Sequence, residues 1–222
     1  MTNKRNSCIL IGTVVACCII MAFIEIIIEP TYIIKSTIKI IAFLLLPLIA
    51  VKVLNMKAKN DFFSASKDKI IKALLLGAVI FSVIIIGYIV SKAFFDYSSL
   101  INSLSTDQKA GKESFIWIAM YIVFCNSFLE EFIFRYISFV KLSENIPKKI
   151  AYLFSSIMFA CYHIFIIESS FPTPLLLLSL LGLFLGGLVF DYIDEKDKSI
   201  YNSWIIHMFA DLAIMTIWFI NI

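Results

Sequence analysis

Three apolar stretches of the chain carry carboxylate, imidazole and guanidinium side chains at helical spacings. In chain order they contain Glu130, Glu131 and Arg135; Phe159 and His163; and His207 and Asp211. Such groups are expensive in the hydrocarbon region of a membrane, so an acid or histidine inside a membrane helix is by default a candidate for function. Together, these residue types can perform general acid–base chemistry on water or bind a metal ion.

Composition indicates that these stretches lie in a membrane. Hydrophobic residues make up 61% of the 222 residues and charged residues 16%, whereas soluble domains are about half apolar and about a quarter charged. Charge-free runs span residues 8–24, 73–91, 114–129, 150–167 and 169–190. Runs near ~20 residues match the ~30 Å hydrocarbon core of a bilayer. The net charge of +3 is small and scattered, so we expect the lipid bilayer, and no nucleic acid, as a partner.

We therefore predict an all-α fold, a polytopic membrane helical bundle of about seven transmembrane helices, with six to eight as the range. The predicted helices span residues 8–28, 33–54, 71–94, 114–140, 149–168, 174–191 and 200–220. Prolines and charge clusters separate them. We expect one compact membrane domain. Residues 1–113 would supply the first three helices and their loops, and residues 114–222 a catalytic core of four helices.

The distribution of basic residues predicts the orientation, because cytoplasmic loops are enriched in Lys and Arg. A cytoplasmic N-terminus places thirteen of them inside: Lys4, Arg5, Lys52, Lys57, Lys59, Lys67, Lys69, Lys72, Lys141, Lys148, Lys149, Lys196 and Lys198. Five fall outside: Lys35, Lys39, Lys92, Lys109 and Lys112. The composition is rich in Ile, Lys, Phe and Asn, as in AT-rich bacterial genomes, so we expect a multi-pass protein of a bacterial plasma membrane.

The two adjacent glutamates are predicted to have different roles. Glu131 and Arg135 are four residues apart, so they share one face of a helix and can pair. Glu130 points roughly 100° away from Glu131 and cannot use the same partner with equal geometry. We expect Arg135 to neutralise and position Glu131, which leaves Glu130 as a general base. The alternative is a structural ion pair between helices, which applies to Glu131 and Arg135 more than to Glu130.

The two histidines have partners one helical turn away. Phe159 precedes His163 by four residues and is expected either to wall a pocket or simply to pack. Asp211 follows His207 by four residues, so its carboxylate can orient the imidazole, or both can bind a metal ion. Helical rise places Glu130, His163 and His207 at overlapping depth near the bilayer midplane, which is expected of a shared site.

The ordered patterns Glu-Glu-x-x-x-Arg, Phe-x-x-x-His and His-x-x-x-Asp over residues 114–215 resemble the CAAX protease and bacteriocin-processing (CPBP/Abi) family of intramembrane proteases. The resemblance implies that Glu130 activates water with help from His163. It also implies that His207 and residue 211 stabilise the oxyanion or bind a metal ion. Eukaryotic CAAX proteases have Asn where this chain has Asp211. An ionised carboxylate would repel an oxyanion, so Asp211 must be protonated, orient His207 or bind a metal ion.

The same four residues, Glu130, His163, His207 and Asp211, could form a zinc site or a metal-free site that activates water. The sequence does not decide between the two. Gly182 and Gly186 form a Gly-x-x-x-Gly pattern, which is typical of closely packed membrane helices.

The resulting functional hypothesis is an intramembrane endopeptidase that acts on a peptide or membrane-protein substrate. Maturation of secreted peptides, bacteriocin processing and self-immunity are the expected contexts. One alternative is a non-catalytic membrane binding or immunity protein. A proton-coupled transporter is another, but transporters usually show paired halves with broken helices, and the sequence shows no such repeat.

The orientation can be tested directly. A topology reporter fused after Asn60 should be read on the cytoplasmic side, because the surrounding 55–72 segment contains five of the thirteen lysines and arginines predicted to lie inside. A reporter read outside the cell would contradict both the orientation and the helix count.

Overall fold

The computed structural model describes residues 2–56, 65–98, 112–167, 171–197 and 199–221, and every regular element in these ranges is helical. Of the basic residues used to predict the orientation, Lys57, Lys59, Lys109 and Lys198 lie outside the described residues.

The described residues form seven long helical stretches. The first half contains α1 (Thr2–Phe23) with η1 (Ile24–Ile28); α2 (Tyr32–Ile40) with η2 (Ile41–Leu45) and α3 (Leu46–Val53); and α4 (Lys67–Ser91). The second half contains α6 (Lys112–Met120), η3 (Tyr121–Asn126), α7 (Ser127–Glu130), η4 (Glu131–Lys141) and η5 (Leu142–Glu144); α8 (Lys148–Ile167); α9 (Thr173–Asp197); and α10 (Tyr201–Phe219).

Six of the described helices are long and apolar enough to cross a membrane, with charge-poor segments of 20 to 30 residues. The seventh long helix is α10, with 19 residues. The prediction of an all-α polytopic bundle is therefore confirmed. Large apolar side chains on the outside, such as Ile33 at 78% and Trp117 at 70% exposure, suit helices whose outer faces contact lipid.

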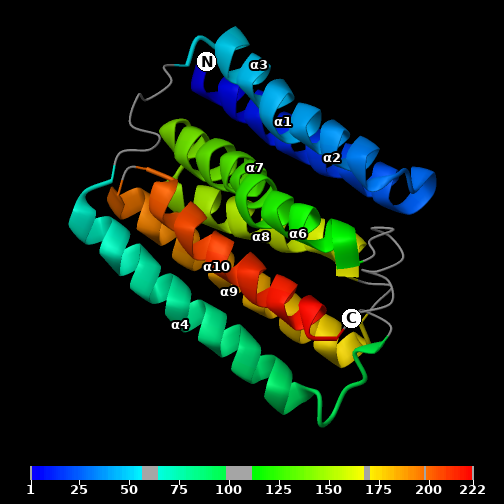
Figure 1. The fold of residues 1–222 in the computed structure, drawn as a ribbon. Helices are drawn as coiled ribbons and strands as arrows, with labels where there is room; N and C mark the ends of the chain where they lie inside the picture. Colours follow the sequence, from blue (N-terminus) through cyan, green and yellow to red (C-terminus); the bar gives the residue numbers. More distant parts are fainter. Residues whose placement is uncertain (1, 57–64, 99–111, 168–170, 198, 222) are drawn as a thin grey trace.

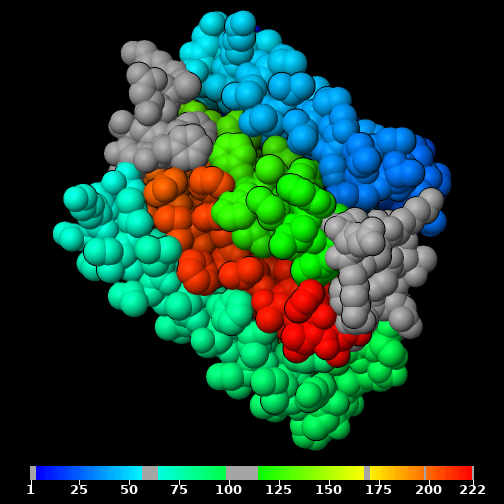
Figure 2. Space-filling view, viewed as in Figure 1, coloured from blue at the N-terminus to red at the C-terminus, as the bar shows by residue number. Residues whose placement is uncertain are grey.

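The bundle places the ionisable helices in its middle. Figure 1 shows α1, α2 and α3 on one side and α4 on the opposite side, with α6, α7, α8 and α10 between them. In the space-filling view, α7 and α10 lie between the N-terminal helices and α4 (Figure 2). Helix α10 packs along α4, and α8 packs along α9. The site residues are thus carried by helices that have neighbours on both sides.

A buried aromatic cluster joins the N-terminal helices to the central ones. The ring of Phe43, from η2, lies 5.7 Å from Phe134 of η4 and 5.1 Å from Tyr162 of α8. Phe134 in turn contacts Phe159 at 5.4 Å. Aromatic pairs at these separations contribute beyond their buried area. They fix α2 and η2 against the helices that carry Glu130 and His163.

Helix α9 extends beyond its predicted end. The sequence predicts a helix that stops at Asp191, whereas the structure continues it to Asp197. Asp191 is fully buried, and its Oδ1 lies 2.9 Å from Ser155 Oγ and its Oδ2 3.4 Å from Ser156 Oγ. The end of the helix was misplaced because a buried aspartate was taken for a terminal one. Its hydrogen-bond partners come from α8 and are not visible in the local sequence.

The close approach of α8 and α9 occurs at Gly187, not within the predicted Gly-x-x-x-Gly pattern. Nothing lies within 4 Å of a Cβ built at Gly182 or Gly186. A Cβ at Gly187 would lie 3.0 Å from Ser156 Cα. Gly187 precedes Asp191 by one helical turn, so the small residue allows the backbone contact that brings Asp191 to the serines of α8. The predicted role of Gly182 and Gly186 was wrong.

We predict that Gly187→Ala lowers the stability of the folded protein by about 1–3 kcal/mol through overpacking. Gly186→Ala is the matched control, and it should match or exceed the wild type because Ala favours helices by roughly 1 kcal/mol over Gly. Thermal unfolding of both purified variants in the same detergent measures the difference. Equal unfolding temperatures would contradict the close contact at Gly187.

Candidate active site

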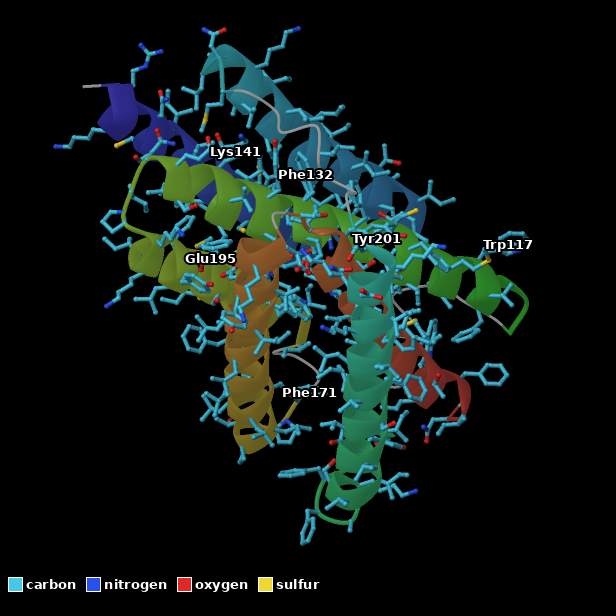
Figure 3. The ribbon with its side chains drawn as sticks, turned by 90° about the vertical axis from the view of Figure 1, so that its left-hand side faces the viewer. Trp117, Phe132, Lys141, Phe171, Glu195 and Tyr201 are labelled. Carbon is cyan, nitrogen blue, oxygen red and sulfur yellow. The ribbon has the colours of Figure 1, made fainter. Side chains whose placement is uncertain are left out.

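The two glutamates lie at a change in helix geometry within the longest helical stretch. The segment from Lys112 to Lys141 alternates between α- and π-helical turns, and α7 ends at Glu130 where η4 begins with Glu131. Short π-helical insertions often occur at functional sites because they redirect side chains. Figure 3 shows Lys141 and Trp117 at opposite ends of this stretch with Phe132 between them. The carboxylates thus lie near the centre of the helix, as the depth estimate predicts.

Glu130 is 2% exposed, and its two oxygens have different partners. Oε1 accepts hydrogen bonds from Lys39 Nζ at 2.7 Å and from Asn126 Nδ2 at 3.0 Å. Oε2 lies 3.6 Å from His163 Nε2 and 3.7 Å from His207 Nε2. These two separations are longer than direct hydrogen bonds. One oxygen is therefore anchored, and the other faces both histidines.

His163 is oriented by its own helix. Its Nδ1 lies 2.8 Å from the carbonyl oxygen of Phe159, which can only accept, so Nδ1 carries the proton. In the neutral ring, Nε2 then has the lone pair and points toward Glu130. The Phe159 ring packs edge-on to the imidazole at 4.7 Å. Phe159 therefore both orients and walls the site.

His207 is oriented by Glu131. Its Nδ1 lies 2.8 Å from Glu131 Oε1, and a carboxylate at this position fixes the tautomer and the ring plane. Phe159 and Phe190 contact the imidazole at 5.9 and 5.8 Å. Glu131 thus does more than pair with Arg135. The sequence offers Asp211 for the orienting role, but the structure gives the Nδ1 contact to Glu131.

Asp211 lies near Nε2 of His207, the ring nitrogen that Glu131 does not contact. Its Oδ1 is 3.7 Å from His207 Nε2, the nitrogen that also faces Glu130. Its Oδ2 is buried and makes no hydrogen bond to any described residue. The structure thus brings Glu130, His163, His207 and Asp211 together from three helices, as the sequence predicts.

Arg135 is the centre of a buried polar network that includes Glu131, the partner of His207. Its Nε lies 3.6 Å from Glu131 Oε2 and 4.0 Å from Asp191 Oδ1, and its Nη1 donates to Ser155 Oγ at 3.1 Å. The guanidinium also stacks 4.4 Å from the centre of the Phe159 ring. Arginine suits such a position because it combines forked donors with a flat face. The predicted Glu131–Arg135 pair is present and shared with Asp191.

The same side chains were predicted as possible metal ligands, and their geometry bears on this prediction. Each histidine has Nδ1 held by an oxygen acceptor and Nε2 directed inward, the usual arrangement of an imidazole ligand. In the described part of the chain, however, no three His, Cys, Asp or Glu side chains are placed so that they could hold a metal ion. Lys39 and Asn126 also occupy Glu130 Oε1. The residues as placed do not fit zinc, and the chemistry below is derived from the protein groups.

Lys39 was missed as a site residue. The charge distribution predicts that Lys39 lies on the outer side of the membrane. In the structure it is buried, with 6% of its surface exposed, beside Glu130 and Asn126. The available signal was its place: Lys39 lies well inside the helix predicted for residues 33–54. An ionisable residue inside a membrane helix is a candidate for function by default, and this rule was applied only to acids and histidines.

An apolar cavity of about 380 Å³ lies beside the site, between α1 with η1 and α8. Cys18, Phe23 and Ile27 line one side, and Cys161 and Tyr162 line the other. The Tyr162 ring contacts His163 at 5.3 Å. The side chain of His163 is 17% exposed, the most of the four central residues. Tyr162 therefore links this apolar cavity to His163.

A buried carboxylate beside two imidazoles is chemically suited to activating a water molecule. Residues 112–213, just under half of the chain, match the family model described as type II CAAX prenyl endopeptidase Rce1-like. The match spans every predicted site residue and confirms the resemblance to the CAAX protease and bacteriocin-processing family. These residues are therefore similar to an endopeptidase family, and they lie in a multi-pass membrane protein. No curated protein and no solved structure shows significant similarity to the chain.

Arg135→Ala should lower the stability of the folded protein by roughly 3–5 kcal/mol, because it leaves Glu131 and Asp191 buried without their cation. Lys148→Ala is the matched control. Its pair with Glu195 is largely exposed, so we expect a change of about 0–1 kcal/mol. Yield and unfolding temperature in detergent measure both variants. A normal unfolding temperature for Arg135→Ala would contradict the buried network.

Proposed function

We propose that the chain hydrolyses a peptide bond within the membrane, with Glu130 as the general base. The observation that carries this is the arrangement around Glu130. One oxygen is anchored, and the other faces two imidazole Nε2 atoms at 3.6 and 3.7 Å. Polar groups at such separations can share a bridging water. A water between them would be polarised for attack.

In the proposed reaction the water oxygen attacks the carbonyl carbon of the substrate while Glu130 Oε2 takes a proton from the water. His163 Nε2 accepts the second hydrogen bond of that water and fixes its direction. When the carbon–nitrogen bond breaks, the proton on Glu130 passes to the departing nitrogen. The products are a carboxylic acid, which keeps the second proton of the water, and an amine, and Glu130 returns to its starting form.

His207 is proposed to stabilise the oxyanion. The carboxylate of Glu131 at Nδ1 favours an imidazolium, whose Nε2–H can donate to the developing negative charge. Asp211 Oδ1 lies 3.7 Å from the same Nε2 atom of His207. In this proposal Asp211 is either protonated or pairs with the imidazolium of His207. This role suits a position where the related CAAX enzymes have Asn.

The substrate is proposed to be a peptide or membrane-protein segment with an apolar part. The cavity beside Tyr162 supports this, because it is lined by apolar groups and Tyr162 also contacts His163. A prenylated C-terminus fits such a surface, as does the leader of a secreted peptide or a bacteriocin. We propose peptide maturation, bacteriocin processing or self-immunity in a bacterial plasma membrane, with a cytoplasmic N-terminus.

Glu130→Gln should lower kcat by about 10²–10⁴-fold, the usual contribution of general acid–base catalysis, and leave the protein folded. His163→Ala and His207→Ala should also abolish cleavage. Glu144→Gln is the control, since this carboxylate pairs with Lys141 far from the histidines. Purified protein is incubated with lipidated and unmodified peptides, and products are identified by mass spectrometry. Cleavage by Glu130→Gln would contradict the mechanism and favour a binding or immunity protein.

Asp211→Asn, measured in the same assay, separates the metal-free mechanism from the predicted zinc set. If Asp211 assists an oxyanion site, the Asn variant should retain or raise activity. If Glu130, His163, His207 and Asp211 bind zinc, the substitution should lower both activity and the zinc content of the purified protein. Elemental analysis before and after treatment with a chelator provides the second readout.

A further inference from the structure

Glu130 depends on a residue outside the region matched by the family. Lys39 lies on α2, 91 residues before Glu130 in the chain, and its Nζ donates to Glu130 Oε1 at 2.7 Å. The ammonium also donates to Asn126 Oδ1. The matched residues 112–213 contain both acceptors but not the donor.

The ammonium is held in place by aromatic rings. It lies 4.9 Å from the centre of the Tyr162 ring and 5.3 Å from that of Phe43. Cation–π contacts of this kind are strongest where water is excluded, and Lys39 is nearly fully buried. Lys39 is therefore fixed from α8, η2 and α7 at once, and a flexible lysine becomes a rigid donor.

Two donors on one carboxylate oxygen determine where the other points. Lys39 Nζ and Asn126 Nδ2 both bind Oε1 of Glu130, so Oε2 is left toward His163 and His207. A shift of about 1 Å in a reacting group can reduce the rate by about 100-fold. Holding Oε1 is thus a means of placing Oε2.

Charge gives a second reason for a lysine here. Glu130, Glu131 and Asp211 bring three carboxyl groups to the two histidines, and Arg135 is shared between Glu131 and Asp191. Among the described residues, Lys39 is the one Lys or Arg that pairs with Glu130. Lys39 is therefore the basic side chain that offsets this concentration of carboxyl groups at Glu130.

We propose that Lys39 is a positioning residue for the reaction and that α2 is an integral part of the catalytic unit. Lys39 anchors Glu130 Oε1, directs Oε2 to the reacting water and offsets the carboxyl group of Asp211. This inference rests on the proposed peptidase function for its catalytic part. The ion pair itself can be tested without any substrate.

The test uses the purified full chain in detergent with Lys39→Met, Lys39→Arg and Lys35→Met. Lys35→Met is the matched control, because Lys35 lies one turn earlier on α2 and pairs with Glu25 away from the histidines. Lys39→Met should lower kcat by about 100-fold with KM unchanged. Lys39→Arg should recover about ten-fold of this, because a guanidinium can still donate to the carboxylate. Lys35→Met should retain the wild-type kcat.

A stability cycle provides a readout independent of cleavage. Lys39→Met should lower the unfolding temperature, because it leaves Glu130 buried and unpaired, and adding Glu130→Gln should recover part of the loss. The positioning role is overturned by a wild-type kcat for Lys39→Met, or by an equal loss for Lys35→Met, while Glu130→Gln remains inactive. If Glu130→Gln still cleaves, the proposed function fails, and the stability measurements then test the Lys39–Glu130 ion pair by themselves. A double variant that is no more stable than Lys39→Met would overturn the ion pair too.

Discussion

The burial of several carboxyl groups in one apolar bundle is the constraint on which this structure depends. A charge inside a membrane protein must find a partner, because removing it from water without one is costly. Glu130 finds Lys39 and Asn126, and Glu131 finds His207 and Arg135. Each partner comes from a different helix or turn, so pairing these charges also fixes the positions of the helices.

The division of labour between the two adjacent glutamates follows from the same constraint. Successive side chains on a helix point in different directions, and here they face different neighbours. Glu130 faces the histidines with one free oxygen, whereas Glu131 is enclosed by His207 Nδ1 and Arg135. The polar network continues to Asp191 through Ser155. The two adjacent carboxylates thus differ in role because their side chains point in different directions.

Packing sets the precision of this arrangement. Gly187 allows α9 to approach α8 closely enough for Asp191 to reach Ser155 and Ser156. Phe159 lies between Arg135 and both histidines. The aromatic contacts of Phe43 then join α2 to the same core. Small and aromatic residues at these positions convert a set of charges into a site with fixed directions.

The sequence by itself determined the fold class, and it predicted that Glu130, His163 and His207 would lie close together. Long charge-free runs predict membrane helices, and a helix has constant rise, so the depths of Glu130, His163 and His207 could be calculated. Only the tertiary structure decided the role of Lys39, the Glu131–His207 contact, the burial of Asp191 and the close approach at Gly187. These depend on which helices become neighbours and how each is rotated about its axis. Helical periodicity is local and contains no information on contacts between residues 91 positions apart.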